Sequence, residues 1–276
     1  MGQFFRNFFL FEGWDWKVEG YFSWQHLTFV TFLMIVMTSC AIWLGLKNRH
    51  ADAKTKNKVM IWAAILIDGF ELIKIVLGCI REKDALNFLT NLPLFLCSIQ
   101  LITIPIAAFT KGKLKEASLD FVSIFGLLGA VLGTYLAGQN YSCYPVLSFT
   151  NVVSGITHSI SGFCALYILI SGMASMKFKN IWITFTILGC FGACAYAVNR
   201  IFLASAGSCP NYMFLMGGDG TPYDIVYNLV NGNKVIYPLL VIFLFVIWIS
   251  VFYGTLYLIR KNKVKKQEKD LTPELV

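Results

Sequence analysis

Seven long apolar stretches, separated by short polar segments, organise the sequence. Each stretch is long enough to cross a bilayer as a helix, which takes about 20 residues. The pattern therefore predicts an all-α, polytopic membrane protein with seven transmembrane helices. The stretches lie at 22–46, 58–80, 89–110, 119–138, 149–173, 181–205 and 236–259.

The basic residues between these stretches predict how they are oriented. Sixteen Lys and Arg fall in the segments after the first, third and fifth stretches and in the C-terminal tail, against five in the alternate segments. Because cytoplasmic loops carry the excess of Lys and Arg, we expect the N-terminus outside and the C-terminus in the cytoplasm. This gives an interfacial aromatic segment (1–21), a seven-helix transmembrane domain (22–259) and a basic cytoplasmic tail (260–276).

Composition agrees with a multi-pass protein of the cell membrane. Of the 276 residues 57% are hydrophobic and 14% are charged, whereas a soluble domain carries about a quarter charged residues. The net charge of +8 therefore reflects loop asymmetry, and we expect membrane lipids and no nucleic acid as partners. The longest segment between stretches, 206–235 on the outer side, is rich in Gly and aromatic residues, which predicts a lid or re-entrant piece.

Polar residues inside the predicted spans gather in their outer halves. Cys97 and His158 lie at matching depths, roughly 12–14 Å below the outer boundary at 1.5 Å per residue. Asp68, Glu71 and Lys74 follow a spacing of three that places them near one helix face. Because titratable residues inside a membrane are costly and mark functional sites, we expect a shared cavity that opens toward the outer leaflet. The other members of this set are Gln100, Asn199 and Arg200.

Each of these residues also has a structural interpretation. A buried cysteine packs as a small hydrophobe, Glu71 and Lys74 can form a structural ion pair, and an arginine near a helix end can reach the headgroups. Cys190 and Cys194 lie one turn apart without an accompanying His or carboxylate, so we expect no metal site, and no motif indicates a cofactor.

Two cysteines, Cys143 and Cys209, lie in predicted outer segments. The outer side of the membrane permits disulfides, so a bridge between these two residues is one hypothesis. Two free thiols are the alternative.

Three motifs resemble those of YwaF-type bacterial integral membrane proteins, which are related to human transmembrane protein 164. They are LPLFLCS (92–98), ITHSISGFCALYILISG (156–172) and CPNYMFL with GDGTPYDIV (209–226), and their order and spacing agree over about residues 22–255. The human relative is described as a membrane acyltransferase with a Cys nucleophile and a His. The resemblance implies these roles for Cys97 and His158. Phe95 stands where the family often has His, which leaves a second histidine role open.

The predicted chemistry needs a base for the thiol and donors for an oxyanion. His158 is placed to accept the Cys97 proton, and the thiolate would form a thioester with the acyl group of an outer-leaflet lipid. Glu71 would orient either His158 or Lys74. Pro93 is tolerated in the first turn of a helix, where it leaves backbone groups free. The candidate donors and remaining cavity residues are Gln100, Asn199, a backbone amide near Pro93, and Tyr212.

Two other functions are compatible with the sequence. A transporter or channel with a polar outer vestibule predicts polar residues that continue to the cytoplasmic side, and commonly inverted repeats; neither is visible in the sequence. A non-catalytic lipid-binding protein predicts that Cys97 is replaceable. Neither the acyl donor nor the acceptor, lipid or water, can be derived from the sequence.

Overall fold

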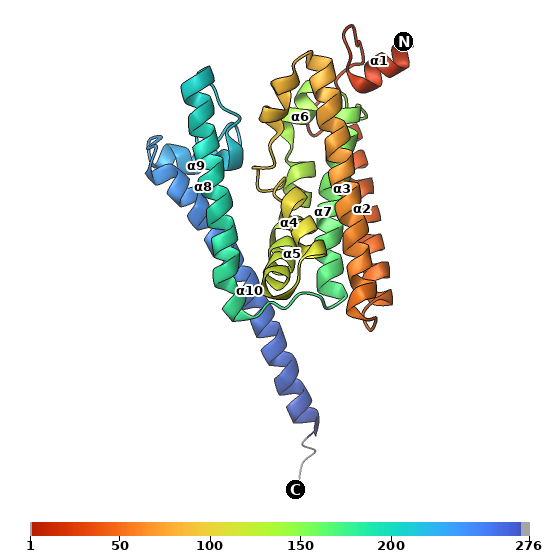
Figure 1. Cartoon of the computed structure of the whole chain (residues 1–276), viewed down its shortest axis with the longest axis vertical. Coiled ribbons are helices and arrows are strands. Elements are labelled where there is room, and N and C mark those ends of the chain that lie inside the picture. Colours follow the sequence, from red (N-terminus) through yellow and green to blue (C-terminus); the bar gives the residue numbers. More distant parts are fainter. Residues whose placement is uncertain (1, 272–276) are drawn as a thin grey trace. The chain divides into compact units, whose positions relative to one another are not determined.

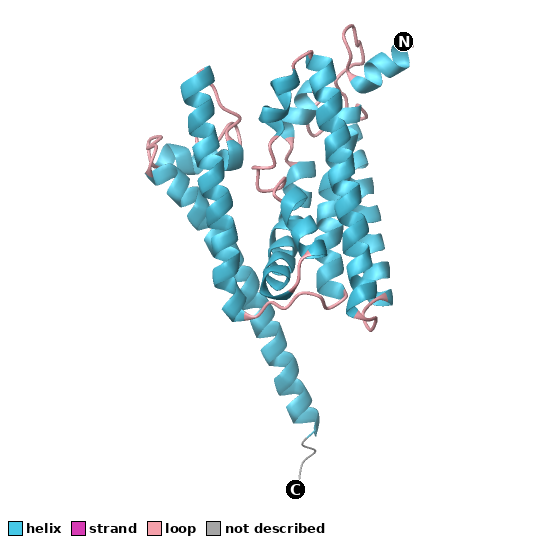
Figure 2. Cartoon of the chain, viewed as in Figure 1, coloured by secondary structure: helices cyan, strands magenta, loops and turns pink. Residues whose placement is uncertain are grey.

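The computed structural model describes residues 2–271, and all regular secondary structure among them is helical (Figures 1 and 2). This confirms the all-α class. The chain divides into two compact units, residues 1–174 and 175–276. Within residues 2–271, five helices are long and apolar enough to cross a membrane. They are Trp24–Lys47, Gly112–Cys143, Phe149–Ile170, Phe178–Ala206 and Ile236–Ile259.

The first unit is built around α7 (Phe149–Ile170), which packs against α2 (Trp24–Lys47), α3 (Ala53–Glu82) and α5 (Gly112–Tyr135). Figure 1 shows α2, α3 and α7 running alongside one another. The packed faces combine small side chains, which allow helix axes to approach closely, with aliphatic side chains and buried aromatic rings such as Tyr167 and Phe125. Cys164 is fully buried among them, where it acts as the small apolar residue that a buried cysteine usually is.

Helix α3 covers the predicted stretch 58–80 and is longer at both ends. It is absent from the five apolar spans, and its middle carries the charged residues Asp68, Glu71 and Lys74. The prediction of seven spans and of their orientation therefore stays a prediction. What is shown is a membrane protein with several apolar helices.

The stretch 89–110 differs most from its prediction, because it is not one helix. Helix η1 (Ala85–Asn91) ends before Pro93, residues 92–99 are irregular, and α4 (Gln100–Phe109) begins only afterwards (Figure 2). The residue before a proline is driven out of the helical region, and Leu92 has ψ 146°. Pro93 is therefore not in the first turn of a span, and Cys97 lies in the turn before α4 instead of inside a helix.

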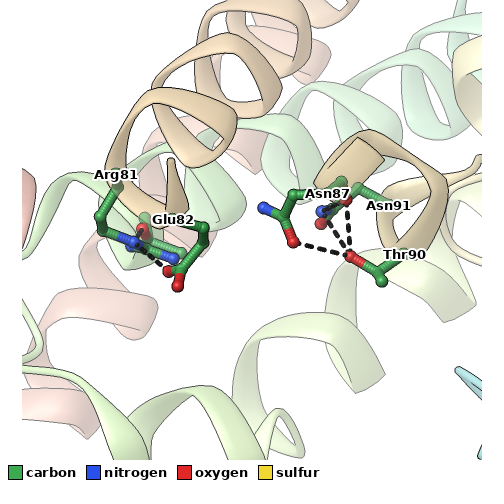
Figure 3. Close-up of polar contacts among 6 residues, drawn as sticks. Arg81, Glu82, Asn87, Thr90 and Asn91 are labelled. Atoms are coloured by element: carbon green, nitrogen blue, oxygen red, sulfur yellow. Dashed lines mark hydrogen bonds and ion pairs between the residues drawn. The ribbon is translucent and has the colours of Figure 1, made fainter. Parts of the chain in front are cut away.

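Side-chain hydrogen bonds fix the junction between α3 and η1 (Figure 3). Arg81 Nε lies 2.8 Å from Glu82 Oε1 at the end of α3. In η1, Thr90 Oγ1 donates to the Asn87 carbonyl at 2.7 Å, and Asn91 Nδ2 donates to the same carbonyl at 3.2 Å. Both contacts in η1 thus supply side-chain donors to one carbonyl, that of Asn87. The chain therefore leaves α3 in a defined direction before it enters the irregular segment.

At the other end of α4, one lysine joins three helices. Lys115 of α5 donates to the Ala107 carbonyl of α4 at 2.7 Å and to Asn57 Oδ1 of α3 at 2.6 Å. Asn57 Nδ2 in turn donates to the Ala108 carbonyl at 2.8 Å. These bonds satisfy the last carbonyls of α4, which have no partner inside the helix.

The N-terminal segment 1–21 folds onto the first unit. Its helix α1 (Gln3–Phe9) contacts the start of α7, where Phe9 and Phe149 have ring centroids 5.1 Å apart. Asp15 accepts hydrogen bonds from Gln3 at 3.0 Å and Asn7 at 2.7 Å, and these bonds lower the pKa of its carboxyl group. The segment is thus held by polar contacts as well as by the aromatic side chains that the sequence displays.

The second unit contains α8 (Ile181–Ala206), η3 (Tyr212–Phe214), α9 (Tyr223–Leu229) and α10 (Ile236–Leu271), preceded by η2 (Phe178–Asn180). Helices α8 and α10 pack together, and Thr184 and Tyr253 share a buried hydrogen bond of 3.1 Å between them. The 206–235 segment holds η3, which contacts α8, and α9, which contacts α10. The short helix α6 (Gly138–Cys143) belongs to the first unit.

Candidate functional site

Four of the predicted site residues line one cavity in the first unit. Cys97 comes from the turn before α4, His158 from α7, and Glu71 and Lys74 from α3. The cavity has a volume of about 30 Å³, enough for one or two water molecules. Thus the structure places the thiol and the imidazole at one small cavity, together with one carboxylate and one ammonium group.

Two glycines of α5 form the surface on which Cys97 and His158 pack. A Cβ atom on Gly133 would lie 2.6 Å from His158 Nε2, and one on Gly129 would lie 3.3 Å from the Cα and Cβ atoms of Cys97. Residues four apart in a helix are neighbours on one face, with Cβ positions about 5–6 Å apart. The absence of side chains at these two positions is therefore what allows the turn before α4 and helix α7 to converge on α5.

Glu71 is engaged with Lys74 across one helical turn. The Lys74 Nζ and Glu71 Oε1 atoms lie 2.7 Å apart, and the two side chains are 20% and 11% exposed. A pair held at this spacing on one face of a helix is favourable. Of the two roles predicted for Glu71, the geometry favours orienting Lys74. Asp68 lies one turn away on α3 and does not line the cavity.

Cys97 lies in a turn beside backbone N–H groups. Its sulfur is 3.9 Å from Ser98 Oγ, and Ile99 N–H donates to the Phe95 carbonyl at 2.9 Å, which starts the turn into α4. Among residues 2–271, the N–H groups of Cys97 and Ser98 form no backbone–backbone hydrogen bond, and both interact with the Cys97 sulfur. Donors of this kind stabilise a negative acceptor, so this turn can stabilise negative charge on the Cys97 sulfur. Phe95 does not line the cavity.

The His158 ring has no hydrogen-bond partner in the described part of the chain, and it is half-buried. Ser154, one turn earlier on α7, and Thr157 line the same cavity, and the Thr157 hydroxyl donates to the Ser154 carbonyl at 3.0 Å. With no partner of its own, the imidazole is free to exchange a proton at either ring nitrogen.

Sequence reasoning missed several contributors to the cavity. The sequence signals that could have found them are the i,i+4 spacing of Ser154 and His158 and the glycine spacing in α5. The missed residues are Ser98, Gly129, Gly133, Ser154 and Thr157.

Two predicted residues of the first unit lie outside the cavity lining. Gln100 is fully buried, and its Oε1 accepts from Thr103 at 3.1 Å while Nε2 has no partner in the described residues. Pro93 forms a tight turn in which Leu94 N–H donates to the Leu92 carbonyl at 2.7 Å. Neither side chain lines the Cys97 cavity.

The remaining predicted residues belong to the second unit. Asn199 is fully buried, and its side chain pairs with both backbone groups of Tyr212, at 2.8 Å to N–H and 3.0 Å to the carbonyl. This pair of bonds to the backbone favours an anchor for the 206–235 segment over an oxyanion donor. Arg200 is exposed on α8.

The cysteines proposed to form a disulfide are both free thiols, Cys143 exposed and Cys209 half-buried. They lie in different units, so the bridge stays a prediction. Within residues 2–271, no group of three or more His, Cys, Asp or Glu side chains is arranged to hold a metal ion.

Comparison with known proteins gives one match. The model of the TMEM164 family matches residues 21–253, which include every residue that lines the Cys97 cavity. No curated protein and no solved structure matches the chain.

Proposed function

Because the chain belongs to the TMEM164 family, we propose that it is an integral membrane acyltransferase that acts on acyl esters of outer-leaflet lipids through Cys97 and His158. The observation that carries the proposal is that the Cys97 thiol and the unpartnered His158 imidazole line one cavity. A nucleophile beside a base is the arrangement that covalent acyl transfer requires. The immediate partners are lipids of the cell membrane, and the chemistry needs no cofactor.

The first half-reaction forms a thioester. A nitrogen of His158 takes the thiol proton, and the Cys97 sulfur attacks the ester carbonyl carbon to give a tetrahedral oxyanion. The N–H groups of Cys97 and Ser98, which form no backbone–backbone hydrogen bond, supply donors for that oxyanion. As the carbonyl re-forms, the carbon–oxygen ester bond breaks, and the departing alkoxide takes the proton from His158. The products are the lyso-lipid and the acyl thioester of Cys97.

The second half-reaction regenerates the enzyme. His158 removes a proton from the hydroxyl or amine of an acceptor, whose oxygen or nitrogen attacks the thioester carbonyl. The carbon–sulfur bond then breaks, the thiolate recovers the proton from His158, and the acyl group has moved to the acceptor. Lys74, held by Glu71 at 2.7 Å, places positive charge beside both intermediates.

Substrate must widen the cavity, because about 30 Å³ admits only water-sized molecules. The segment 92–99 is the part of the wall that can move at least cost. It lies outside regular helix, between η1 and α4, whereas His158 is fixed on a continuous helix. We therefore assign substrate entry to the side of the cavity formed by the segment 92–99.

Labelling with a thiol-reactive lipid analogue tests the dyad. An alkyl chloroacetamide in lipid nanodiscs should alkylate Cys97, and His158→Ala should slow the reaction roughly 100-fold if the imidazole acts as base. Cys79→Ala is the matched control, because Cys79 is also a half-buried thiol of the first unit and should leave Cys97 labelling unchanged. Equal labelling of Cys97 with and without His158, together with unchanged lipid profiles in cells lacking the protein, would rule the proposal out.

A second candidate, a lipid hydrolase, uses the same two residues. The water-sized cavity between thiol and imidazole favours it, because water would then replace the acceptor in the second half-reaction. Incubation in ¹⁸O-labelled water separates the two functions. Hydrolysis places the label in a free fatty acid, whereas transfer places unlabelled acyl groups on a second lipid.

A further inference from the structure

The second unit contains a cavity that the chemistry of Cys97 does not use. Its volume is about 180 Å³, several times that of the Cys97 cavity. It lies where the end of α8, the 206–235 segment and the start of α10 meet, with Leu203, Tyr227 and Tyr237 contributed by α8, α9 and α10. All of its lining residues belong to the second unit.

Most of the cavity wall is apolar. Leu203, Leu215 and Met216 line it, and the rings of Tyr227 and Tyr237 meet edge to face with centroids 5.1 Å apart. Walls of this kind favour a hydrocarbon portion in the ligand. Leu203 is 38% exposed, so a chain bound inside can continue outward along α8.

The polar groups of the wall act mainly as hydrogen-bond donors. Lys234 is its charged side chain, and no carboxylate lines it. Asn233 uses its side-chain oxygen to cap the N–H groups of Val235 and Ile236, each at 3.0 Å, which leaves its NH₂ group as a donor. An ammonium and an amide, without a carboxylate to oppose them, favour an anionic ligand.

A buried hydroxyl in the same wall has no partner. Tyr237 is 1% exposed, and its oxygen forms no hydrogen bond with the described residues. Leaving such a group unsatisfied costs free energy, so native structures rarely do it without a reason. Two carboxylates, Asp219 and Asp224, lie near Tyr237 but outside the lining, and Asp219 accepts a hydrogen bond from Asn211 at 2.7 Å.

We propose that this cavity binds the carboxylate end of an alkyl carboxylic acid. The Lys234 ammonium pairs with the carboxylate, the Tyr237 hydroxyl gains the acceptor that it lacks, and the alkyl chain lies against Leu203, Leu215 and Met216. The volume suits a carboxyl group with the first part of its chain and excludes a whole phospholipid. The acid reaches the site either from the bilayer, as a free fatty acid, or from solution, as a short-chain acid.

Three ligands of equal chain length and different charge test this proposal. The full-length protein in nanodiscs, with reduced thiols, is treated with maleimide in the presence of octanoate, octanol or octylamine, and the alkylation of Cys209, which lines the cavity, is followed by mass spectrometry. Octanoate should protect Cys209, with an apparent affinity about tenfold above that of octanol, as expected for one charge-assisted hydrogen bond. Octylamine should give no protection. Equal protection by octanoate and octanol overturns the proposal.

Variants separate specific binding from partitioning into the membrane. Lys234 is exposed, so Lys234→Gln should fold normally and abolish the preference for octanoate. Cys97→Ala should leave it unchanged, and the proposal then stands whether or not Cys97 performs acyl transfer. Octanoate binding that persists fully in Lys234→Gln contradicts the assignment. Nanodiscs doped with oleate distinguish the sources: protection at low oleate content, with none by soluble octanoate, assigns the site to membrane fatty acid.

Removal of the Tyr237 hydroxyl should affect thermal stability and octanoate binding in opposite directions. Without ligand, Tyr237→Phe should leave thermal stability unchanged or raised, because it deletes an unpaired buried hydroxyl. With octanoate, the same variant should lose part of the protection of Cys209. Tyr253→Phe is the matched control, since the Tyr253 hydroxyl shares a hydrogen bond with Thr184 at 3.1 Å, and it should lower stability while leaving octanoate binding intact. A Tyr237→Phe variant with unchanged octanoate protection removes Tyr237 from the site.

Discussion

The two elements that bring Cys97 and His158 to the cavity are built in opposite ways. His158 lies in the interior of α7, a continuous helix over Phe149–Ile170, whereas Cys97 lies in a turn between two short helices, η1 and α4. Both pack on the same glycine surface of α5. A rigid element thus presents the base, and an irregular element presents the nucleophile.

The contrast shows how a membrane site can hold its base in a fixed position and still admit a substrate. Helix α7 satisfies its own backbone hydrogen bonds, so its side chains are fixed by packing against α2, α3 and α5. In the segment 92–99 the N–H groups of Cys97 and Ser98 form no backbone–backbone hydrogen bond, which is tolerated within a membrane only where the backbone is buried in protein or lines a cavity. The same irregularity supplies the oxyanion donors and the movable wall in the proposed mechanism.

The largest loss of Cys97 reactivity is expected when a side chain is added beside His158 on helix α7. In Gly133→Ala the new methyl group overlaps the His158 ring, and a helix held by three neighbours cannot shift to make room. Overpacking of this kind costs about 1–3 kcal/mol, and we expect His158-dependent alkylation of Cys97 to fall at least about tenfold because the base is displaced. The measurements are the alkylation rate and the thermal unfolding temperature.

The control for this substitution is Gly69→Ala in α3. A Cβ atom on Gly69 has no heavy atom within 4 Å, so the same change should leave reactivity unaltered and stabilise the helix by up to ~1 kcal/mol. If Gly133→Ala leaves the alkylation rate and the unfolding temperature as unaffected as Gly69→Ala does, the His158 ring does not lie on the α5 surface.

How far the sequence predicts this fold can be judged on the same elements. The apolar stretches 149–173 and 181–205 correspond closely to α7 (149–170) and α8 (181–206), because hydropathy reports long buried or lipid-facing helices directly. The stretch 89–110 is equally apolar and yet broken. Hydropathy does not distinguish a helix from irregular backbone that lines a cavity. The local signal, Leu92 before Pro93, marks a helix boundary but does not predict the conformation of the residues beyond it.

For the site, depth along each span suggested a group of polar residues, of which Cys97, His158, Glu71 and Lys74 line one cavity; the continuous helix assumed for Cys97 was wrong. Asn199 shows why the rest was out of reach. Its partner Tyr212 lies thirteen residues away in the separate short helix η3, so no periodicity links the two. The glycines of α5 were visible in the sequence, but the residues that pack on them depend on tertiary structure.

An intermediate effect is expected at the C-terminal end of α4. Lys115→Met removes the two hydrogen bonds to the Ala107 carbonyl and to Asn57. It should destabilise the protein by about 1–3 kcal/mol, because these groups lose their charged donor. Hydrogen exchange should accelerate in α4 and in the segment 92–99 but not in α7. Lys113→Met, at an exposed position in α5, is the control and should change neither the stability nor the hydrogen exchange. Equal exchange in the two variants would show that the segment 92–99 is positioned independently of Lys115.

The smallest loss of Cys97 reactivity is expected for Gly129→Ala, which tests whether the turn around Cys97 can move. Its new methyl group would lie 3.3 Å from the Cα and Cβ atoms of Cys97, so the neighbour must yield by only a few tenths of an ångström. Because Cys97 lies in a turn outside any regular helix, the turn should shift and keep its reactivity within about threefold of wild type, a loss below 1 kcal/mol. Side-by-side alkylation rates of Gly129→Ala and Gly133→Ala provide the measurement. A loss at Gly129→Ala as large as that at Gly133→Ala would mean that the turn is as rigid as α7, and substrate entry past the segment 92–99 would then have to be abandoned.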